Sequence, residues 1–464
     1  MPLDLPVLAG LPRQRTAFHV EVADAAAERA HRRLRRDVFV AEQQLFAADD
    51  HDDADDDPRR RVLVARTADG TVVGGVRLAP CTAEDVGWWR GSRLVVTPRA
   101  RTLGGVGSAL VRAACAHAEE LGALRFEATV QTRGAVLFRR LGWEHVRDVV
   151  VQGVPHALVR YPMDRPRRLA EATKAALAGV LDGLVQTPAG FLGDDGTPVP
   201  GTDVVAACDA VLPSLVDRDP EWAGWCAVLV NVNDLAAMGA APVGLLDALA
   251  APTADHARRV VAGLRAASRA WGVPVLGGHT QFGVPAALSV TALGRTADPV
   301  PAGGGRPGHA LSLTVDLGGS WRPGYTGSQW DSSSRRSPGD LRQMGSSVAR
   351  TRPAAAKDVS MAGLLGTVGM LAEASGVGAE IDVTSVPRPP GTTVGDWFTC
   401  FPGFGVVTAD LPGRAPAPAG PATTATVGRL HAAASPDDRG VALRWPDGEV
   451  TRVIPGPVTG MGTA

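Results

Sequence analysis

The clearest chemical signal in the 464-residue sequence is a group of polar residues that ends a long apolar run. Asn231, Asn233 and Asp234 follow the segment AGWCAVLV (223–230), whose apolar and β-branched residues predict a buried strand running into a helix. Buried polar side chains need hydrogen-bond partners or a ligand, and their oxygens suit Mg²⁺ and nucleotide phosphate. Alternatively, Asn233 or Asp234 caps the helix, and both roles can hold together.

Related motifs lie upstream and downstream of this group. GDDG (193–196) and Asp209 supply more carboxylates, and Lys357 with Asp358 precedes a predicted helix. The segment GVPVLGGHT (272–280) predicts a strand that ends in two glycines and a histidine, and paired glycines permit the close approach of a phosphate. We expect the acidic and amide oxygens around 195, 209 and 234 to converge on a divalent cation and a triphosphate.

A glycine-rich loop in the first third of the chain offers a second chemistry. Gly104, Gly105 and Gly107 join the predicted strand 92–97 to a predicted helix at 107–121. Such a turn lets backbone N–H groups and a helix N-terminus approach an anion, here a pyrophosphate. The alternative is a loop that only closes the strand–helix connection.

Glu42, in the segment VFVAEQ, is the candidate for directing or deprotonating an amine. Its alternative is an ordinary surface carboxylate or a salt-bridge partner.

The elements that must position these groups fall into three predicted units, 1–165, 166–300 and 301–464. The first reads as mixed α/β, and the second opens with a helix over 169–185. Elements predicted for the first unit are a helix at 25–36, a hairpin of 62–66 and 71–78, strands at 92–97 and 125–130, helices at 107–121 and 133–141, and closing strands near 143–150 and 156–161.

The charge balance excludes several classes of partner. Lys and Arg total 47 against 48 Asp and Glu, so no global field attracts nucleic acid or an anionic membrane. The one charge block, DDHDDADDD (49–57), is either a solvated acidic loop or a rim for a cationic substrate. The longest apolar run, 235–246, is shorter than the ~20 residues of a membrane span. Five scattered cysteines and no evident signal peptide lead us to expect a cytoplasmic protein.

Residues 20–162 resemble the GNAT acyltransferase superfamily in the order of VFVAEQQLF (38–46), the hairpin, the glycine loop and AVLFRRLGW (135–143). The resemblance implies a splayed central sheet, acetyl-CoA or another acyl-CoA between two strands, and acyl transfer to an amine. Phe138 replaces a Tyr that is common in the family's final helix, and Thr102 stands where Gln or Arg is usual. The implied cofactor-binding residues are Val95, Arg101, Gly104, Gly105, Val106, Gly107 and Ser108.

Residues from about 170 to 464 resemble the aminoimidazole ribonucleotide (AIR) synthetase superfamily, which includes selenophosphate synthetase, thiamine-monophosphate kinase and a hydrogenase-maturation protein. Within this superfamily they resemble AIR synthase-like proteins, sometimes fused to a GNAT domain, from bacterial nitrilase gene clusters. The resemblance implies an ATP-binding subdomain that dimerises through its sheet, and a second subdomain on the substrate side. The implied metal ligands are Asp195, Asp209 and Asp234, the implied ATP contacts are Asp209, Asn233, Gly277 and Gly278, and the implied catalytic residues are Lys357 and His279.

The sequence therefore predicts an α/β and α+β protein: a GNAT-like mixed sheet with flanking helices, followed by a two-subdomain AIR synthase-like α/β module. The predicted function is bifunctional, namely acyl-CoA-dependent N-acyl transfer joined to Mg²⁺- and ATP-dependent phosphoryl transfer or amide activation, with small amines or amides as substrates and a link to nitrogen or nitrile metabolism. The alternative is a regulatory protein that binds CoA and ATP with little turnover.

Overall fold

The computed structural model describes residues 18–414 and 416–464. Internal contacts divide the chain into two compact units, Met1–Met163 and Asp164–Ala464. The predicted division of the second unit near residue 300 stays a prediction. Among the described residues, no helix is long and apolar enough to cross a membrane.

The first unit is built on a seven-stranded sheet in the order β1-β2-β3-β4-β5-β7-β6. All elements predicted from the sequence for this unit are present, with ends that differ by a few residues. The strands are β1 (Phe18–Val22), β2 (Arg61–Thr67), β3 (Val72–Pro80), β4 (Trp88–Val96), β5 (Arg125–Gln131), β6 (Glu144–Val151) and β7 (Val154–Tyr161). The helices are α1 (Ala25–Arg35), the π-helical η2 (Arg36–Glu42), α2 (Val106–Glu120) and α3 (Ala135–Arg140).

Strands β4 and β5 are parallel but pair over only part of their length. Their ladder joins Trp88–Gly91 to Arg125–Ala128 and ends there. Beyond that point β5 continues beside β7 to Gln131, whereas β4 continues beside β3. The centre of the sheet is therefore splayed, in agreement with the family resemblance.

The two faces of this sheet pack against different helices. Phe126 and Val130 of β5 share a core with Leu110 of α2. On the opposite face, Val64 of β2 packs with Ala27 of α1. Because side chains alternate along a strand, Glu127, Thr129 and Gln131 of β5 face the side of α1 and η2.

Arginines form ion pairs with the acidic run 49–57. Arg35 donates to Asp50 (2.8 Å) and to Asp55 (2.6 Å), and both of these aspartates are buried. Arg77 also pairs with Asp55, and Arg93 pairs with Asp50. Both interpretations of the run, a solvated loop and a rim for a cationic substrate, are wrong for Asp50 and Asp55. These two aspartates are buried ion-pair partners. The arginines that bind them lie on α1, β3 and β4, from 15 to 43 positions away in the sequence.

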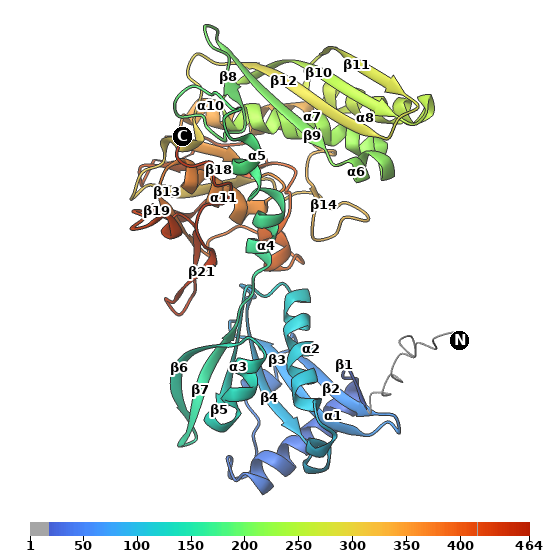
Figure 1. Cartoon of the computed structure of the whole chain (residues 1–464), viewed down its shortest axis with the longest axis vertical. Helices are drawn as coiled ribbons and strands as arrows, with labels where there is room; N and C mark the ends of the chain where they lie inside the picture. The colour runs from blue at the N-terminus through green and yellow to red at the C-terminus, as the bar shows by residue number, and fades with distance from the viewer. Residues whose placement is uncertain (1–17, 415) are drawn as a thin grey trace, which may run out of the picture. The chain divides into compact units, whose positions relative to one another are not determined.

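The second unit begins with two short helices, α4 (Arg165–Thr173) and α5 (Leu177–Leu181), where the sequence predicted one helix over 169–185. A five-stranded sheet follows in the order β11-β10-β12-β9-β8. Helices α7 and α8 lie against one face of this sheet, and within the described residues no helix covers the other face (Figure 1). The bounds are β8 (Thr197–Pro198), β9 (Val204–Val211), α6 (Pro213–Arg218), α7 (Pro220–Ala237), β10 (Ala241–Ala251), α8 (Ala254–Trp271), β11 (Val275–Phe282) and β12 (Ala287–Arg295).

The prediction of a strand at 223–230 is wrong, because this segment forms the middle of α7. The helix packs between the five-stranded sheet, α8 and β16 (Ala355–Asp358), so almost all its side chains are buried. A helix that is apolar on all sides has no 3.6-residue polar period, and its sequence cannot be told from a buried strand by pattern alone. Asn233 and Asp234 lie near the C-terminal end of α7, so neither caps the start of a helix.

A second, seven-stranded sheet has the order β16-β18-β13-β19-β17-β20-β21. One core joins both sheets of this unit and includes Val228 of α7, Val290 of β12 and Val406 of β18. The remaining elements are β13 (Ala310–Val315), β14 (Ser320–Trp321), β15 (Trp330–Asp331), α9 (Pro338–Gly345), α10 (Ser347–Thr351), α11 (Gly363–Ala374), β17 (Gly378–Asp382), α12 (Val394–Thr399), β18 (Gly405–Asp410), β19 (Thr423–His431), β20 (Val441–Arg444) and β21 (Val450–Ile454).

Candidate functional site

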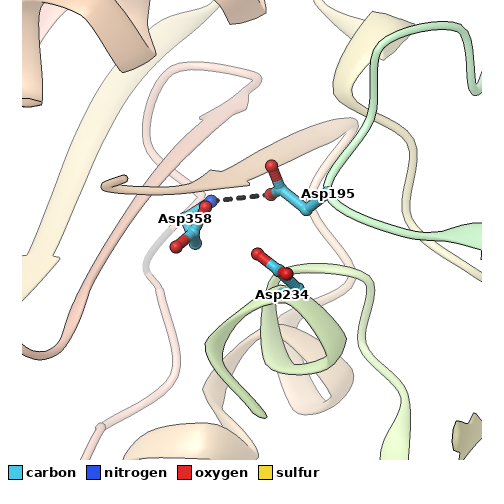
Figure 2. A group of neighbouring side chains, drawn as sticks. All are labelled: Asp195, Asp234 and Asp358. Carbon is cyan, nitrogen blue, oxygen red and sulfur yellow. Dashed lines mark hydrogen bonds between the residues drawn. The ribbon is translucent and has the colours of Figure 1, made fainter. Parts of the chain in front are cut away.

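Three aspartates from distant parts of the second unit converge on one point (Figure 2). Asp195 lies in the loop before β8, Asp234 near the end of α7, and Asp358 at the end of β16. One carboxylate oxygen of each residue lies within 4.8 Å of the other two. The Asp234 and Asp358 residues are only 5% and 2% exposed. Three hard oxygen donors at this spacing can contact one small divalent cation.

Backbone and side-chain contacts hold these carboxylates in place. The backbone N–H of Asp358 donates to Oδ2 of Asp195 over 2.8 Å. The buried ammonium group of Lys357 forms an ion pair with Asp195 and donates to the carbonyl oxygen of Gly193 (3.2 Å). β16 thus contributes both a carboxylate and a cation to the site.

Asn233 has a structural contact of its own. Its side-chain amide donates to the carbonyl oxygen of Gly403 over 2.7 Å, and the residue is buried. This bond ties the end of α7, which carries Asp234, to the loop before β18.

Burial and repulsion between carboxylates perturb the acidity of the cluster. Burial first, and then the charges of Asp358 and Asp209, raise the pKa of Asp234 well above its ordinary value. Burial and the charge of Asp195 raise the pKa of Asp358 in the same way. A bound cation relieves such repulsion, so this donor set fits a divalent metal ion such as Mg²⁺.

Two further charged residues lie beside the three aspartates. Burial raises the pKa of Asp194 to about 7, with Lys357 acting in the opposite direction. Burial by itself would lower the pKa of Lys357, but the carboxylates of Asp195 and Asp194 raise it above its usual value. Lys357 therefore stays charged at neutral pH, despite being buried.

Asp209 lies next to the cluster rather than within the group of three. It is on β9, its side chain is solvent-accessible, and its charge acts on the pKa of Asp234. Partial desolvation raises the pKa of Asp209 itself, and the charge of Lys174 opposes this.

Gly277, Gly278 and His279 lie on β11, the edge strand of the five-stranded sheet, where every residue is exposed. Gly278 is in the same cross-strand row as Asp209, three strands away. Neighbouring strands are about 4.8 Å apart, so some 14 Å separate these two positions. Within one chain, the structure does not bring the Gly-Gly-His group to the aspartates.

Asp358 is the one residue of these three aspartates that the sequence does not identify as a metal ligand. The sequence places it only beside Lys357, before a predicted helix. The sequence feature that could have identified Asp358 is a carboxylate at the end of a short buried strand, AAKD. Only its contact with Asp195, a residue 163 positions earlier, assigns it to the site.

In the first unit, the glycine loop before α2 has positive φ angles and open space around it. Gly104 and Gly105 have φ angles of 68° and 78°, which side-chain-bearing residues rarely adopt. A Cβ at Gly104 would meet no atom within 4 Å, and Gly105 is the N-cap of the 15-residue helix α2. The hydroxyl of Ser108 donates to the carbonyl oxygen of Gly105 over 2.9 Å. The first N–H groups of α2 are thus available to a pyrophosphate.

The remaining residues assigned to this site have mixed environments. Val95 and Val106 are buried at 2% exposure each, so only their main-chain atoms can contact a cofactor. Arg101 donates two hydrogen bonds to Glu42, of 2.7 and 2.9 Å. These bonds lower the pKa of Glu42, which weakens it as a base. The salt-bridge alternative for Glu42 is thus present.

A cavity of about 850 Å³ opens where β4 and β5 separate. Its lining includes Ser92 of β4, Gln131 of β5, Val111 of α2, Phe138 of α3 and His156 of β7. This volume is within the range of small-ligand sites.

Comparisons with known proteins find different protein families in the two units. A family model described as a GNAT acetyltransferase domain matches residues 58–145. Models for the N-terminal and C-terminal domains of AIR synthase related proteins match 193–296 and 339–444. An uncharacterized protein of Synechocystis sp. is 35% identical over 228 residues, which cover 48% of this chain and 70% of the relative.

The chain belongs to the AIR synthase related family. This AIR synthase related protein is also 31% identical over 171 residues to thiamine-monophosphate kinase of Methanospirillum hungatei, covering 36% of the chain and 58% of the kinase. The structure of T. maritima PurL complexed with ADP has a TM-score of 0.52 at 16% identity, covering 71% of this chain and 54% of PurL, which shows similarity of fold alone. Asp195 and Asp234 lie in the matched N-terminal domain and Asp358 in the matched C-terminal domain.

Proposed function

We propose that the second unit of this AIR synthase related protein binds ATP with Mg²⁺. It then either transfers the terminal phosphoryl group to a small substrate or uses it to activate an amide or carbonyl oxygen. The observation that carries this proposal is the convergence of Asp195, Asp234 and Asp358 from three separate elements. The similarity to proteins named thiamine-monophosphate kinases supports phosphoryl transfer as the class of reaction.

In this proposal each residue has a distinct part. Asp195, Asp234 and Asp358 hold the metal ion, which supplies charge neutralisation to the phosphates when bound. Lys357 keeps Asp195 in position and adds a permanent positive charge. Asn233 fixes the end of α7 through Gly403. Phosphoryl transfer depends chiefly on positioning and charge stabilisation, and this arrangement provides both.

We propose that the first unit transfers an acyl group from acetyl-CoA, or another acyl-CoA, to a small amine. The N-terminus of α2 with its glycine loop would hold the pyrophosphate, and the opening between β4 and β5 would hold the thioester arm. Phe138 cannot donate a proton to the departing sulfur. A thiol of pKa near 8.5 can leave as thiolate, so this loss is tolerable.

We also propose a homodimer formed through the open face and edge of the five-stranded sheet. Large apolar side chains are exposed there, and β11 is accessible along its whole length. Exposed apolar surface next to an unpaired strand edge marks an interaction surface. The side chains concerned are Val243, Leu246, Val275, Leu276 and Phe282.

ATP turnover tests the proposal for the second unit. Purified full-length protein receives ATP and Mg²⁺ with a panel of small amines, amides and nitrile-derived acids, which also probes the predicted link to nitrogen or nitrile metabolism. ADP or phosphate release is expected with at least one compound, and Asp234→Asn should abolish it. The matched control is Asp298→Asn, because Asp298 is an exposed aspartate that pairs with the exposed Arg352. ATP binding without product across the panel would instead favour the regulatory alternative.

A further inference from the structure

His156 is a buried histidine that the proposed chemistry has so far left unused. It lies on β7, is 5% exposed and lines the cavity between β4 and β5. In the sheet it pairs directly with Gln131 of β5, which lines the same cavity. Directly paired residues on neighbouring strands share a face, so both side chains belong to the same wall.

The hydrogen bonding of His156 fixes its tautomer. Nδ1 lies 2.8 Å from the carbonyl oxygen of Val154. A carbonyl oxygen can only accept, so Nδ1 carries the proton, and in the neutral ring Nε2 keeps its lone pair. Within the described part of the chain, no hydrogen-bond partner for Nε2 is found. An imidazole held in this way presents a free base.

The face on which His156 lies is the one an acceptor would use. Gln131 donates to Gln43, which directly follows η2, over 2.8 Å. The His156 side of the sheet is therefore the side of α1 and η2, opposite the α2 helix whose N-terminus would bind the pyrophosphate. If the thioester enters the opening from the α2 side, the acceptor amine approaches it from the opposite face of the sheet, on which His156 lies. His156 is one strand, about 4.8 Å, from Gln131 at the border of that opening.

We propose that His156 is the general base of the acyl transfer, a role that rests on the acyltransferase function proposed above. Nε2 takes one proton from the acceptor ammonium group, and the freed nitrogen lone pair forms the bond to the thioester carbon. The carbon–sulfur bond then breaks and CoA leaves as thiolate. The amide nitrogen loses a second proton, which the thiolate accepts. His156 then releases to water the proton that it took up at Nε2. Glu42, held by Arg101, is not required for this step.

Chemical modification tests whether Nε2 is free and reachable. Diethyl pyrocarbonate reacts with unprotonated, accessible imidazole nitrogens, and peptide mass spectrometry of the full-length protein locates the product. We expect modification of His156 within about tenfold of the rate at exposed His145, and slower modification with saturating acetyl-CoA. An unmodified His156 beside a fully modified His145 would overturn the proposal.

Kinetics of His156→Asn test the catalytic role itself. The Asn side chain keeps an N–H donor for Val154 but has no basic nitrogen, so a structural role is preserved. We expect thiol release from acetyl-CoA, measured with an amine that wild-type protein acetylates, to fall about 100-fold or more, with an unchanged KM for acetyl-CoA. His156→Ala should be partly rescued by added imidazole. A wild-type rate in His156→Asn overturns this inference alone, whereas no thiol release from wild-type protein with any amine overturns the acyltransferase proposal with it.

Discussion

The backbone N–H of Asp358 donates a 2.8 Å hydrogen bond to the carboxylate of Asp195, joining residues 163 positions apart in the sequence. This bond links the loop before β8 to the end of β16, and with Asp234 it completes a group of three carboxylates (Figure 2). Asp234 and Asp358 are buried, and the buried Lys357 pairs with the third carboxylate, that of Asp195. The cluster is therefore costly when no cation is present and favourable when one is bound.

Asp234→Asn should have opposite effects in the absence and presence of Mg²⁺. Without the ion, the neutral amide removes a desolvated, repelled carboxylate, and the free energy of unfolding should rise by about 1 kcal/mol. Wild-type protein should gain about 2.7 kcal/mol at a Mg²⁺ concentration of 100 Kd, and the variant should lose most of this gain. Denaturant unfolding with EDTA or with Mg²⁺ measures both effects. Equal Mg²⁺ stabilisation of both proteins would show that no ion binds at Asp234.

The stability of the metal-free protein should fall between pH 4 and pH 7 through Asp194. Its pKa is raised to about 7 in the folded state, against about 3.9 in the unfolded chain. In this window the folded state holds more protons than the unfolded state, so raising the pH destabilises it, by at most about 1.4 kcal/mol per pH unit for one group. Asp194→Asn should make this slope shallower, because Asp234 and Asp358 still contribute to it. Asp255→Asn, at a side chain that is 89% exposed, should leave the slope unchanged. Parallel curves of unfolding free energy against pH for wild type and Asp194→Asn would contradict the assignment.

Gly105→Trp should abolish acyl-CoA binding by filling the space above the N-terminus of α2. The substitution also forces a side chain into a left-handed conformation, at a cost of about 1 kcal/mol. Gly70→Trp carries the same backbone cost, because Gly70 has a φ of 85° and open space around it, but it lies in the β2–β3 turn. Calorimetric titration with acetyl-CoA should detect binding in wild type and Gly70→Trp only. Undiminished binding in Gly105→Trp would place the phosphate site elsewhere.

Leu276→Asp should convert the proposed homodimer to monomer. Leu276 is 60% exposed on β11, and a carboxylate buried in an apolar interface costs several kcal/mol. Val150→Asp is the control, since Val150 is 71% exposed on β6 of the first unit. Sedimentation velocity should give a dimer for wild type and Val150→Asp, and a monomer for Leu276→Asp. A wild-type monomer would refute the dimer directly.

The sequence by itself determined the elements of the first unit and singled out most of the polar residues that lie close together in the second. Short apolar runs, two of them joined by turn residues, located β2, β3 and β5, and the glycine loop marked the start of α2. These signals are local to a few neighbouring residues. The acidic motif at 195 and the Asn-Asp pair at 233 and 234 indicated hard oxygen ligands, because carboxylate and amide oxygens keep that preference in any fold.

Only the tertiary structure decided which of these residues meet. Segment 223–230 is a helix because packing surrounds it on every side and removes the polar period by which helices are recognised. Asp358 joins the site and His279 lies apart from it because strand order and register, which no local pattern encodes, set the distances between strands. The same holds for the ion pairs of the acidic run and for the burial of His156, because both depend on packing between different elements of the first unit.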